Sequence, residues 1–364
     1  MDETKKKMIT MSIDYESLKS FFCGKKVLIT GHTGFKGSWM CVLLKKMGAS
    51  VFGYSLEPPT NPSLYEIAHV DNIVSSEIGD IRDFNHLNEY VCKIKPEIII
   101  HMAAQPIVKT GYTDPRMTYE TNVMGTVNIM ESLRNIESAL SFLNVTTDKV
   151  YENNDCTSEF FESDKLDGYD PYSNSKSCSE LVTHSYKKSF FDNSKCAIST
   201  ARAGNVIGGG DFATFRIVPD CVAAAINKKD IIIRNPQSIR PFQHVLEPLF
   251  AYLAIAEAQS RNKELSGYYN VGPEIEDCVT AGELATLFCK SWGNIKWKNV
   301  GDNGPHEAKL LRLNCDLIKN RIGYQPHWHI DKAIDKVVEW SKVWSSGGNV
   351  LECMEKQIYE YMGN

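Results

Sequence analysis

The sequence lacks the features that mark several large classes of protein. Its 11 cysteines include no Cys-x-x-Cys pair, so they indicate reduced thiols rather than a disulfide framework or a zinc site. No apolar run reaches the ~18–20 residues that a membrane span requires, and no apolar segment follows the charged N-terminus as in a signal peptide. The net charge of −5 is unlike the basic excess of most nucleic-acid-binding proteins. We therefore expect a cytoplasmic protein that binds neither membranes nor nucleic acids.

A metal site is not expected either. His327 and His329 stand two residues apart, but no acid or cysteine at a ligand spacing accompanies them. We interpret this pair as structural.

The composition is that of a soluble globular protein, with 43% apolar and 23% charged residues. Short apolar runs alternate with amphipathic segments through the first half of the chain. The expected strands are 26–30, 49–54, 74–80, 97–102 and 141–146, and the expected helices are 38–47, 83–95 and 118–135. This alternation predicts an α/β fold, a Rossmann-like doubly wound parallel sheet with helices on both faces.

The character of the chain changes after Asn205, where three consecutive glycines and several prolines predict a smaller mixed α/β lobe that binds the substrate. The expected division of the chain is a polar extension over 1–20, a dinucleotide-binding domain over 21–203 with about 238–260 and 318–345, a substrate-binding lobe over about 204–237 and 261–317, and a C-terminal helix over 346–364.

A Gly-x-x-Gly-x-x-Gly loop joins the first expected strand to the first expected helix. Gly31 can turn tightly, Gly34 lets backbone amides approach a pyrophosphate, and Gly37 lets the helix pack close to the sheet. The candidate cofactor residues in this loop are Gly31, Thr33, Gly34, Phe35, Lys36 and Gly37. The spacing of three and three favours the short-chain dehydrogenase/reductases, whereas three glycines alone also suit an ordinary loop.

The expected cofactor is NAD. The usual acid at the end of the second strand is missing near Ser55, where Glu57 is the first acid, but no arginine is present to hold a 2′-phosphate. Lys36 is the one nearby cation that would favour NADP. Further candidate cofactor residues follow the third and fourth strands: Asp80, Ile81, Ala103, Ala104 and Gln105.

Tyr172 and Lys176 are four residues apart and therefore share one face of a helix. A lysine cation beside a tyrosine lowers the pKa of the phenol, which can then act as a general base on an alcohol. The alternative is an accidental surface pair, because Tyr-x-x-x-Lys is common. The upstream glycine loop favours catalysis.

Thr147, Asp148 and Lys149 follow the fifth expected strand, at the sheet edge where ligands bind. At this position, an enzyme that only oxidises an alcohol needs just a serine or threonine hydroxyl to hold the substrate, which Thr147 supplies. The adjoining acid and lysine suit an acid and a base acting on neighbouring carbons. The alternative is a solvated turn.

Several cations and polar residues of the second half are candidates for gripping a diphosphate, or else form ion pairs at the surface or between domains. They are Arg202, Asn205, Arg216, Arg234, Arg240 and His244.

Five segments closely resemble the CDP-glucose 4,6-dehydratases of the extended short-chain dehydrogenase/reductases. They are Gly-His-Thr-Gly-Phe-Lys-Gly-Ser-Trp at 31–39, Gly-Tyr-Asp-Pro-Tyr-Ser-Asn-Ser-Lys at 168–176, Gly-Gly-Gly-Asp at 208–211, Arg-Pro-Phe-Gln-His-Val-Leu at 240–246 and Pro-His-Glu-Ala at 305–308. The resemblance implies conversion of CDP-glucose to CDP-4-keto-6-deoxyglucose, with NAD borrowed and returned, for deoxysugar and lipopolysaccharide O-antigen precursors. It also implies at least a homodimer, formed through the helix that carries Tyr172 and Lys176.

The same resemblance assigns roles to residues. Thr147 orients the C4 hydroxyl and Tyr172 takes its proton, Asp148 is the acid for the C6 hydroxyl, and Lys149 is the base at C5. The expected substrate residues also include Gln105, Asn122, His306 and Glu307. The expected cofactor residues also include Asn122, Tyr172 and Lys176.

Two rivals remain open from the residues alone. A nucleotide-sugar epimerase or decarboxylase would use the same tyrosine, lysine and cofactor, but it needs neither Asp148 nor Lys149. A non-catalytic NAD-binding regulator would have little reason to keep Thr147, Tyr172 and Lys176 together.

Overall fold

The computed structural model describes residues 14–153, 159–301 and 312–363. Its centre is a seven-stranded sheet with the order β11-β6-β5-β4-β1-β2-β3, and all its neighbouring strands are parallel. The order reverses beside β1, which confirms the predicted doubly wound sheet. The strands are β1 (Lys26–Thr30), β2 (Ser50–Ser55), β3 (Ser75–Ile78), β4 (Ile98–His101), β5 (Ser141–Thr146), β6 (Ala197–Ala203) and β11 (Tyr268–Val271).

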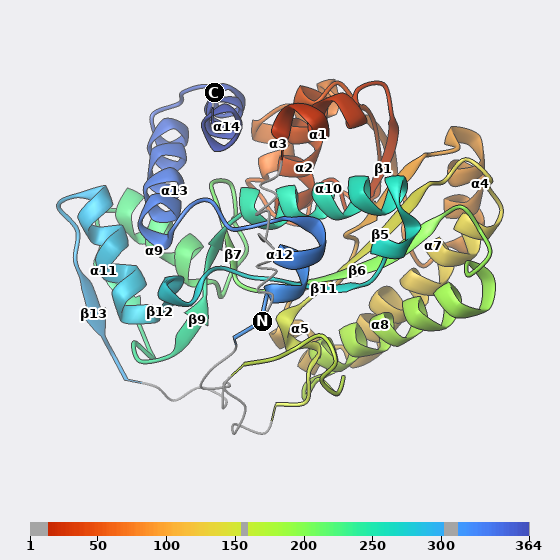
Figure 1. Cartoon of the computed structure of the whole chain (residues 1–364). Helices are drawn as coiled ribbons and strands as arrows, with labels where there is room; N and C mark the ends of the chain where they lie inside the picture. Colours follow the sequence, from red (N-terminus) through yellow and green to blue (C-terminus); the bar gives the residue numbers. More distant parts are fainter. Residues whose placement is uncertain (1–13, 154–158, 302–311, 364) are drawn as a thin grey trace, which may run out of the picture.

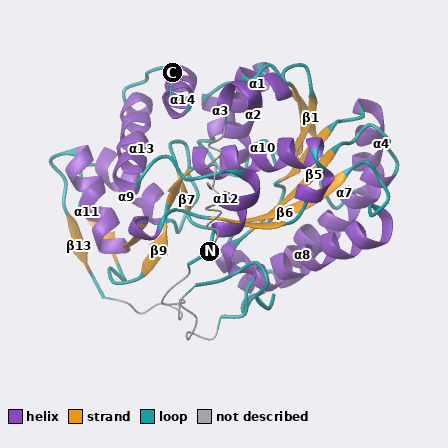
Figure 2. Ribbon diagram, viewed as in Figure 1, coloured by secondary structure: helices purple, strands orange, loops and turns teal. Residues whose placement is uncertain are grey.

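Helices cover both faces of this sheet (Figures 1 and 2). On one face α10 packs on β5 and β6, beside α1 and α2, and α14 packs on α2. On the other face α8 packs on β5 and β6, beside α7, which in turn packs on α4. These helices are α1 (Tyr15–Phe22), α2 (Phe35–Lys46), α4 (Phe84–Ile94), α7 (Gly125–Arg134), α8 (Pro171–Phe190), α10 (Leu246–Arg261) and α14 (Val350–Tyr361).

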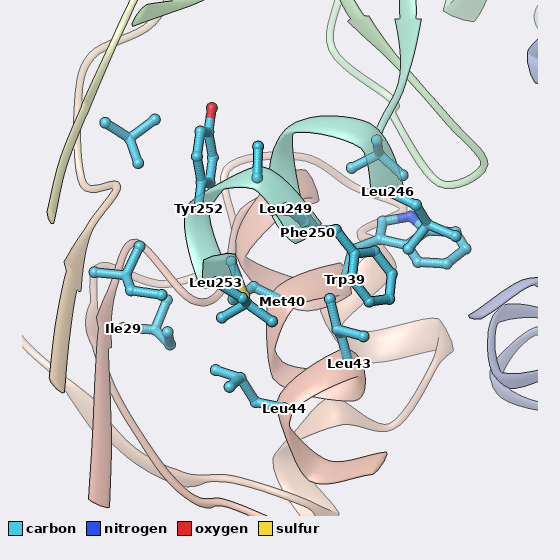
Figure 3. Close-up of a cluster of buried hydrophobic side chains, with 14 of the residues drawn as sticks. Ile29, Trp39, Met40, Leu43, Leu44, Leu246, Leu249, Phe250, Tyr252 and Leu253 are labelled. Carbon is cyan, nitrogen blue, oxygen red and sulfur yellow. The ribbon is translucent and has the colours of Figure 1, made fainter. Parts of the chain in front are cut away.

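The strands of the sheet are apolar on both faces because both faces are covered. Along β1, Val27 and Ile29 belong to the cluster under α2 and α10, whereas Leu28 belongs to the cluster under α4 and α7. Figure 3 shows how Met40 on α2 and Leu253 on α10 meet in the first of these clusters. This packing holds the sheet rigid and leaves its carboxyl-terminal edge to carry a site.

A smaller lobe lies beside the sheet, at the left of Figure 1. It has its own apolar cluster, to which α9, α11 and α13 contribute. Its elements are β7 (Val206–Ile207), α9 (Ile217–Ile226), β8 (Ile231–Ile233), β9 (Ile239–Pro241), β10 (Gln243–His244), β12 (Cys278–Thr280), α11 (Ala281–Trp292), β13 (Trp297–Asn299) and α13 (Ile330–Ser345). The strands pair as β10 with β7, β12 with β9 and β13 with β8.

The remaining elements are short connections. They are α3 (Leu64–Ile67), η1 (Val70–Asn72), α5 (Val108–Thr113), α6 (Pro115–Tyr119), η2 (Glu120–Met124), η3 (Asp148–Val150), η4 (Lys263–Leu265), η5 (Ile275–Asp277) and α12 (Asp316–Ile322). Within the described ranges, no helix is long and apolar enough to cross a bilayer.

Three predicted boundaries are wrong. Residues 1–20 are not a polar extension throughout, because α1 begins at Tyr15 and buries Leu18 completely. The range 261–317 does not lie wholly in the smaller lobe, since β11 pairs with β6 in the main sheet. The range 318–345 does not lie wholly in the dinucleotide-binding domain, because Ile334 and Val337 of α13 pack in the smaller lobe.

The helix predicted over 118–135 is interrupted. Between α6 and α7, the turn η2 is π-helical and contains Asn122. The hydroxyl of Thr126 donates to the carbonyl of Asn122 at 2.7 Å, which gives this carbonyl a partner inside the irregular turn. Such turns occur frequently at functional sites. The helix predicted over 38–47 also begins earlier, at Phe35.

The first and last described helices meet on α10. The ring of Tyr15 lies 5.2 Å from that of Phe250 and 6.1 Å from that of Tyr361. The hydroxyl of Tyr361 donates to the buried carboxylate of Glu247 at 2.7 Å, and Tyr324 donates to the same carboxylate at 2.6 Å. A single buried acid therefore joins α10, α14 and the segment between α12 and α13.

Candidate active site

The glycine loop lies between β1 and α2, against the end of β4. Gly31 has φ +78, and a Cβ there would stand 2.9 Å from Ala103 Cα. A Cβ on Gly37 would stand 2.1 Å from the carbonyl oxygen of Gly31. Gly34 is the N-cap of α2 and offers no side chain to the first amides of the helix. The loop is therefore a narrow cradle of backbone that fits a pyrophosphate at a helix N-terminus.

The other residues of the loop tie it to its surroundings. The hydroxyl of Thr33 donates to the carbonyl of Leu56 at 2.8 Å and lies 2.9 Å from that of Ser55, at the end of β2. Phe35 packs on Gly208, where a Cβ would stand 2.9 Å from the phenyl ring. The cradle is thus fixed to the main sheet on one side and to the glycine triplet on the other.

The residues predicted to meet the adenosine lie at the ends of β3 and β4. Asp80 accepts from the guanidinium of Arg82 at 2.6 Å, and hydrogen bonds from Arg82 lower the pKa of this carboxyl. Ile81 is buried against Gly125 of α7. Ala104 is half-buried after β4. The backbone of Ala103, directly after β4, lies against Gly31 of the glycine loop.

Gln105 and Asn122 form one buried network. The backbone amide of Gln105 donates to Asn122 Oδ1 at 2.8 Å, and Asn122 Nδ2 donates to the hydroxyl of Ser175 on α8 at 2.8 Å. The side-chain amide of Gln105 donates to Thr118 at 2.9 Å. Asn122 therefore joins the segment after β4 to α8, and the side chain of Gln105 joins that segment to α6.

Tyr172 stands in the first turn of α8. The carboxylate of Asp170 caps this helix by accepting from the amides of Tyr172 and Ser173, both at 3.0 Å. Burial raises the pKa of Tyr172 to about 12, while the Thr147 hydroxyl and the charge of Arg216 oppose this rise.

Lys176 is buried one turn farther along α8. Its ammonium donates to the carbonyl of Val145 at 2.9 Å, so it is anchored to the end of β5. Burial lowers its pKa to about 8, and the charge of Lys36 lowers it further. Lys176 therefore joins α8, one turn after Tyr172, to the end of β5.

Thr147, Asp148 and Lys149 follow β5 and share one carboxylate oxygen. The hydroxyl of Thr147 donates to Asp148 Oδ1 at 2.9 Å, and Lys149 Nζ lies 3.2 Å from the same oxygen. Asp148 is completely buried, whereas the side chain of Lys149 is 28% exposed. Asp148 is therefore not part of a solvated turn.

Lys36 extends from the glycine loop toward this centre. Burial lowers its pKa to about 8, repulsion from Arg216 lowers it further, and the charge of Asp148 opposes the shift. The lysine therefore lies on the catalytic side and not at the end of β2, where a 2′-phosphate would bind. Lys36 therefore gives no support to the alternative of NADP, and the expected cofactor remains NAD.

Two predicted substrate residues are parts of the core. Arg202 is 2% exposed and donates to Glu180 at 3.0 Å and to the hydroxyl of Tyr151 at 2.8 Å. His244 is completely buried between the rings of Trp39 and Trp328, at 6.0 and 5.0 Å. Neither side chain is available to a diphosphate, so both predictions are wrong.

The remaining substrate candidates are dispersed. Arg216 pairs with Asp211 at 2.8 Å. Its positive charge lowers the pKa of both Tyr172 and Lys36, so it lies near these two residues. Asn205 follows β6 with φ +34. Arg234 is exposed after β8, and Arg240 lies on β9 with its guanidinium donating to the carbonyl of Ile239. His306 and Glu307 lie outside the described residues.

The sequence alone did not indicate the contacts that α5 makes with the turn of Tyr172 and with Phe215. A Cβ on Gly111 of α5 would stand 3.0 Å from the Tyr172 amide, so α5 packs directly on the catalytic turn. From the same helix, Lys109 Nζ lies 4.0 Å from the centre of the exposed Phe215 ring, next to Arg216. No sequence motif predicts the contact between Lys109 and Phe215, because these residues are 106 positions apart. Among the described residues, no group of three or more His, Cys, Asp or Glu side chains is arranged to hold a metal.

Comparison with known proteins agrees with this geometry. The chain is 43% identical over 351 residues to the CDP-glucose 4,6-dehydratase of Salmonella typhimurium, which covers 94% of this chain and 98% of that protein. It is 25% identical to the CDP-paratose 2-epimerase of Salmonella typhi, over 87% of this chain and 99% of that protein.

Solved structures share the fold. The dTDP-glucose 4,6-dehydratase of Bacillus anthracis, solved in complex with NAD, superposes with a TM-score of 0.74 at 20% identity, over 90% of this chain and 100% of that one. The UDP-glucose 4-epimerase of Thermotoga maritima has a TM-score of 0.75 at 19% identity, over 87% and 98%. The model of the GDP-mannose 4,6-dehydratase family matches residues 28–337. The chain therefore belongs to the GDP-mannose 4,6-dehydratase family, within the extended short-chain dehydrogenase/reductases.

Proposed function

We propose that the chain is a CDP-glucose 4,6-dehydratase, a lyase that converts CDP-glucose to CDP-4-keto-6-deoxyglucose with NAD. The observation that carries this proposal is the identity of 43% to a CDP-glucose 4,6-dehydratase over 94% of the chain. The geometry supports it, because a buried acid and a lysine follow β5 beside the tyrosine and lysine of α8.

The cofactor fits the cradle that the glycine loop forms. A side chain at Gly31 would collide with the backbone of Ala103, and one at Gly37 with the backbone of Gly31, so only glycines let the loop fold this tightly at the helix N-terminus, where a pyrophosphate binds. When bound, NAD would supply the hydride acceptor for oxidation at C4 and the hydride donor for reduction at C6. The residues that would hold it are Gly31, Thr33, Gly34, Phe35, Lys36, Gly37, Asp80, Ile81, Ala103, Ala104, Gln105 and Asn122.

Tyr172 accepts the proton of the C4 hydroxyl in the first step. The Thr147 hydroxyl and the guanidinium of Arg216 lower the pKa of the phenol against the effect of burial, so both favour the phenolate. Lys176 adds a cation that is anchored to β5. General-base catalysis of this kind contributes ~10²–10⁴-fold to the rate.

Asp148 and Lys149 serve the elimination that follows. The C4 ketone acidifies the C5 hydrogen, and Lys149 takes this proton. Its electron pair forms the C5–C6 double bond, the C6–O bond breaks, and Asp148 protonates the departing hydroxyl so that it leaves as water. The ammonium of Lys149 lies 3.2 Å from Asp148, so its proton can pass to the carboxylate before the elimination, and the C5 proton then restores the ammonium.

A nucleotide-sugar 4-epimerase or decarboxylase is the alternative within the same fold. Epimerisation requires neither an acid nor a base beside Thr147, so a buried Asp148 with a paired lysine favours dehydration. A non-catalytic NAD-binding regulator is the alternative from another class. It would not require Thr147 and Tyr172 to stand together beside a buried lysine.

Product analysis with four substrates tests the proposal. The pure protein is incubated with NAD and CDP-, dTDP-, UDP- or GDP-glucose, and the product mass is measured. We expect loss of one water from CDP-glucose. A tenfold preference for dTDP-glucose, about 1.4 kcal/mol in transition-state binding, would overturn the nucleotide assignment. A product of unchanged mass would favour an epimerase, and no product at all would favour a regulator.

The assembly and setting complete the proposal. We place the enzyme in the cytoplasm, in the synthesis of deoxysugar precursors of surface polysaccharide.

We further propose a homodimer through α7 and α8, which pack side by side. Leu181 on α8 is 55% exposed and Met124 before α7 is 49% exposed, so this helix pair presents apolar side chains to solvent. Light scattering of the wild type and of Leu181→Glu tests the dimer, which the charge should weaken.

A further inference from the structure

Gly204 lies directly after β6, facing the carboxylate of Asp148. A Cβ on Gly204 would stand 2.0 Å from Asp148 Oδ2 and 2.4 Å from its Cγ. Real side chains essentially never approach this closely, so any residue other than glycine would have to displace the carboxylate. Position 204 therefore requires glycine, because the carboxylate of Asp148 occupies the space that a side chain would need.

The carboxylate has no easy way to move aside. Its Oδ1 is held by the hydroxyl of Thr147 at 2.9 Å and by the ammonium of Lys149 at 3.2 Å. Its Oδ2 is buried and has no hydrogen-bond partner among the described residues. Asp148 thus occupies a closed slot with Thr147 and Lys149 on one side and Gly204 on the other.

Gly204 is itself held in place by a buried glutamine. Gln243 is 1% exposed, and its side-chain amide donates to the carbonyls of Gly204 and Val271, both at 3.1 Å. Its backbone amide donates to the carbonyl of Asn205 at 3.2 Å. The ends of β6 and β11 are therefore joined behind the slot by a residue of β10.

We propose that Gly204 is a positioning residue for the elimination, with Gln243 holding it. This inference rests on the proposed function. The empty space at Gly204 sets where the proton of Asp148 stands when the C6–O bond breaks and the hydroxyl leaves as water. The removal of hydrogen from C4 depends on Tyr172 and the Thr147 hydroxyl, and it does not use the proton of Asp148.

The test separates oxidation at C4 from loss of water. In Gly204→Ala, reduced cofactor should accumulate in a single turnover, because oxidation continues while water loss slows. A misplacement of about 1 Å costs about 10²-fold, so we expect water loss to fall by about that factor and the oxidation rate to stay within about threefold. Gly267→Ala is the matched control, since a Cβ there meets the nearest atom at an ordinary 3.4 Å.

A double-mutant cycle distinguishes positioning from general damage. If Gly204 acts through the carboxylate of Asp148, then Gly204→Ala should add little to the slowing caused by Asp148→Asn. Gln243→Met, which keeps the length without the donor, should slow water loss in the same direction and provides the test if Gly204→Ala does not fold.

Three results would overturn the inference. They are water loss at the wild-type rate in both Gly204→Ala and Gln243→Met, equal slowing of oxidation and water loss, or fully additive effects with Asp148→Asn. A wild-type protein that dehydrates none of the four nucleotide sugars would instead overturn the proposed function.

Discussion

Replacing Arg202 by methionine tests whether this arginine belongs to the core or to the substrate site. Its guanidinium donates to Glu180 at 3.0 Å, to Tyr151 at 2.8 Å and to the carbonyl of Glu162 at 3.1 Å. The side chains of Arg202 and Glu180 are only 3% and 1% exposed. Methionine fills much of the space but leaves the carboxylate of Glu180 buried without its cation.

The expected cost follows from that isolated charge. Removing one partner of a buried ion pair destabilises proteins by about 3–5 kcal/mol. Glu180 keeps hydrogen bonds from Thr146 at 2.5 Å and Thr200 at 2.8 Å, which soften the loss. We therefore expect Arg202→Met to lower the free energy of unfolding by about 3 kcal/mol, near the lower limit of that range.

Denaturant unfolding and steady-state kinetics are measured together on the same preparation. The KM for the nucleotide sugar should stay within about twofold of the wild-type value, because a residue of the core does not contact the substrate. Arg234→Met is the matched control, because that arginine is exposed and should affect stability by less than about 0.5 kcal/mol. A KM raised tenfold or more with unchanged stability would show that Arg202 binds the diphosphate, and that the assignment to the core is wrong.

Three further predictions concern catalysis and pH. Tyr172→Phe should fold and bind NAD but lose turnover by ~10²–10⁴-fold, and a rate near that of the wild type would refute its role as base. Lys149→Met should suppress deuterium exchange at C5, whereas normal exchange would show that another group is the base. Three buried histidines have folded-state pKa values far below the ordinary 6.5, and we expect them to destabilise the fold in acid: His32 (about 4), His101 (about 3) and His244 (about 3). Below pH 6.5 the unfolded chain binds the additional protons, so the free energy of unfolding should fall by about 1.4 kcal/mol per histidine between pH 7.5 and 5.5; unfolding curves that coincide at the two pH values would contradict this.

The main sheet was predictable from the sequence because its signals are local. An apolar run such as residues 26–30, followed by a glycine loop and a helix, specifies one repeating unit without knowledge of the rest of the chain. The prediction failed at β11, whose four residues, Tyr268–Val271, lie in a part of the chain with different composition. Its place in the sheet depends on pairing with β6, about 70 residues away, and no local pattern reports such a partner.

The candidate site divides in the same way. Tyr172 and Lys176 were predictable because their spacing on one helix is itself the signal. Arg202 and His244 were assigned to the substrate because a sequence does not show burial, and an arginine in a core ion pair has the same letter as one that binds phosphate. Gly204 could not be recognised either, since its importance lies in the carboxylate of a residue 56 positions away.

The meeting of α1 and α14 on α10 has a consequence for rearranging the chain. The rings of Tyr15 and Tyr361 are 6.1 Å apart, so the first and last described helices are neighbours. A short flexible peptide can bridge this gap, which makes the protein suitable for circular permutation. New termini opened at an exposed turn, such as the one after α11 at Gly293, would leave the sheet and the cradle intact. In such a permutant, β13 and α13 of the smaller lobe would emerge from the ribosome before the strands β1 to β6 of the main sheet.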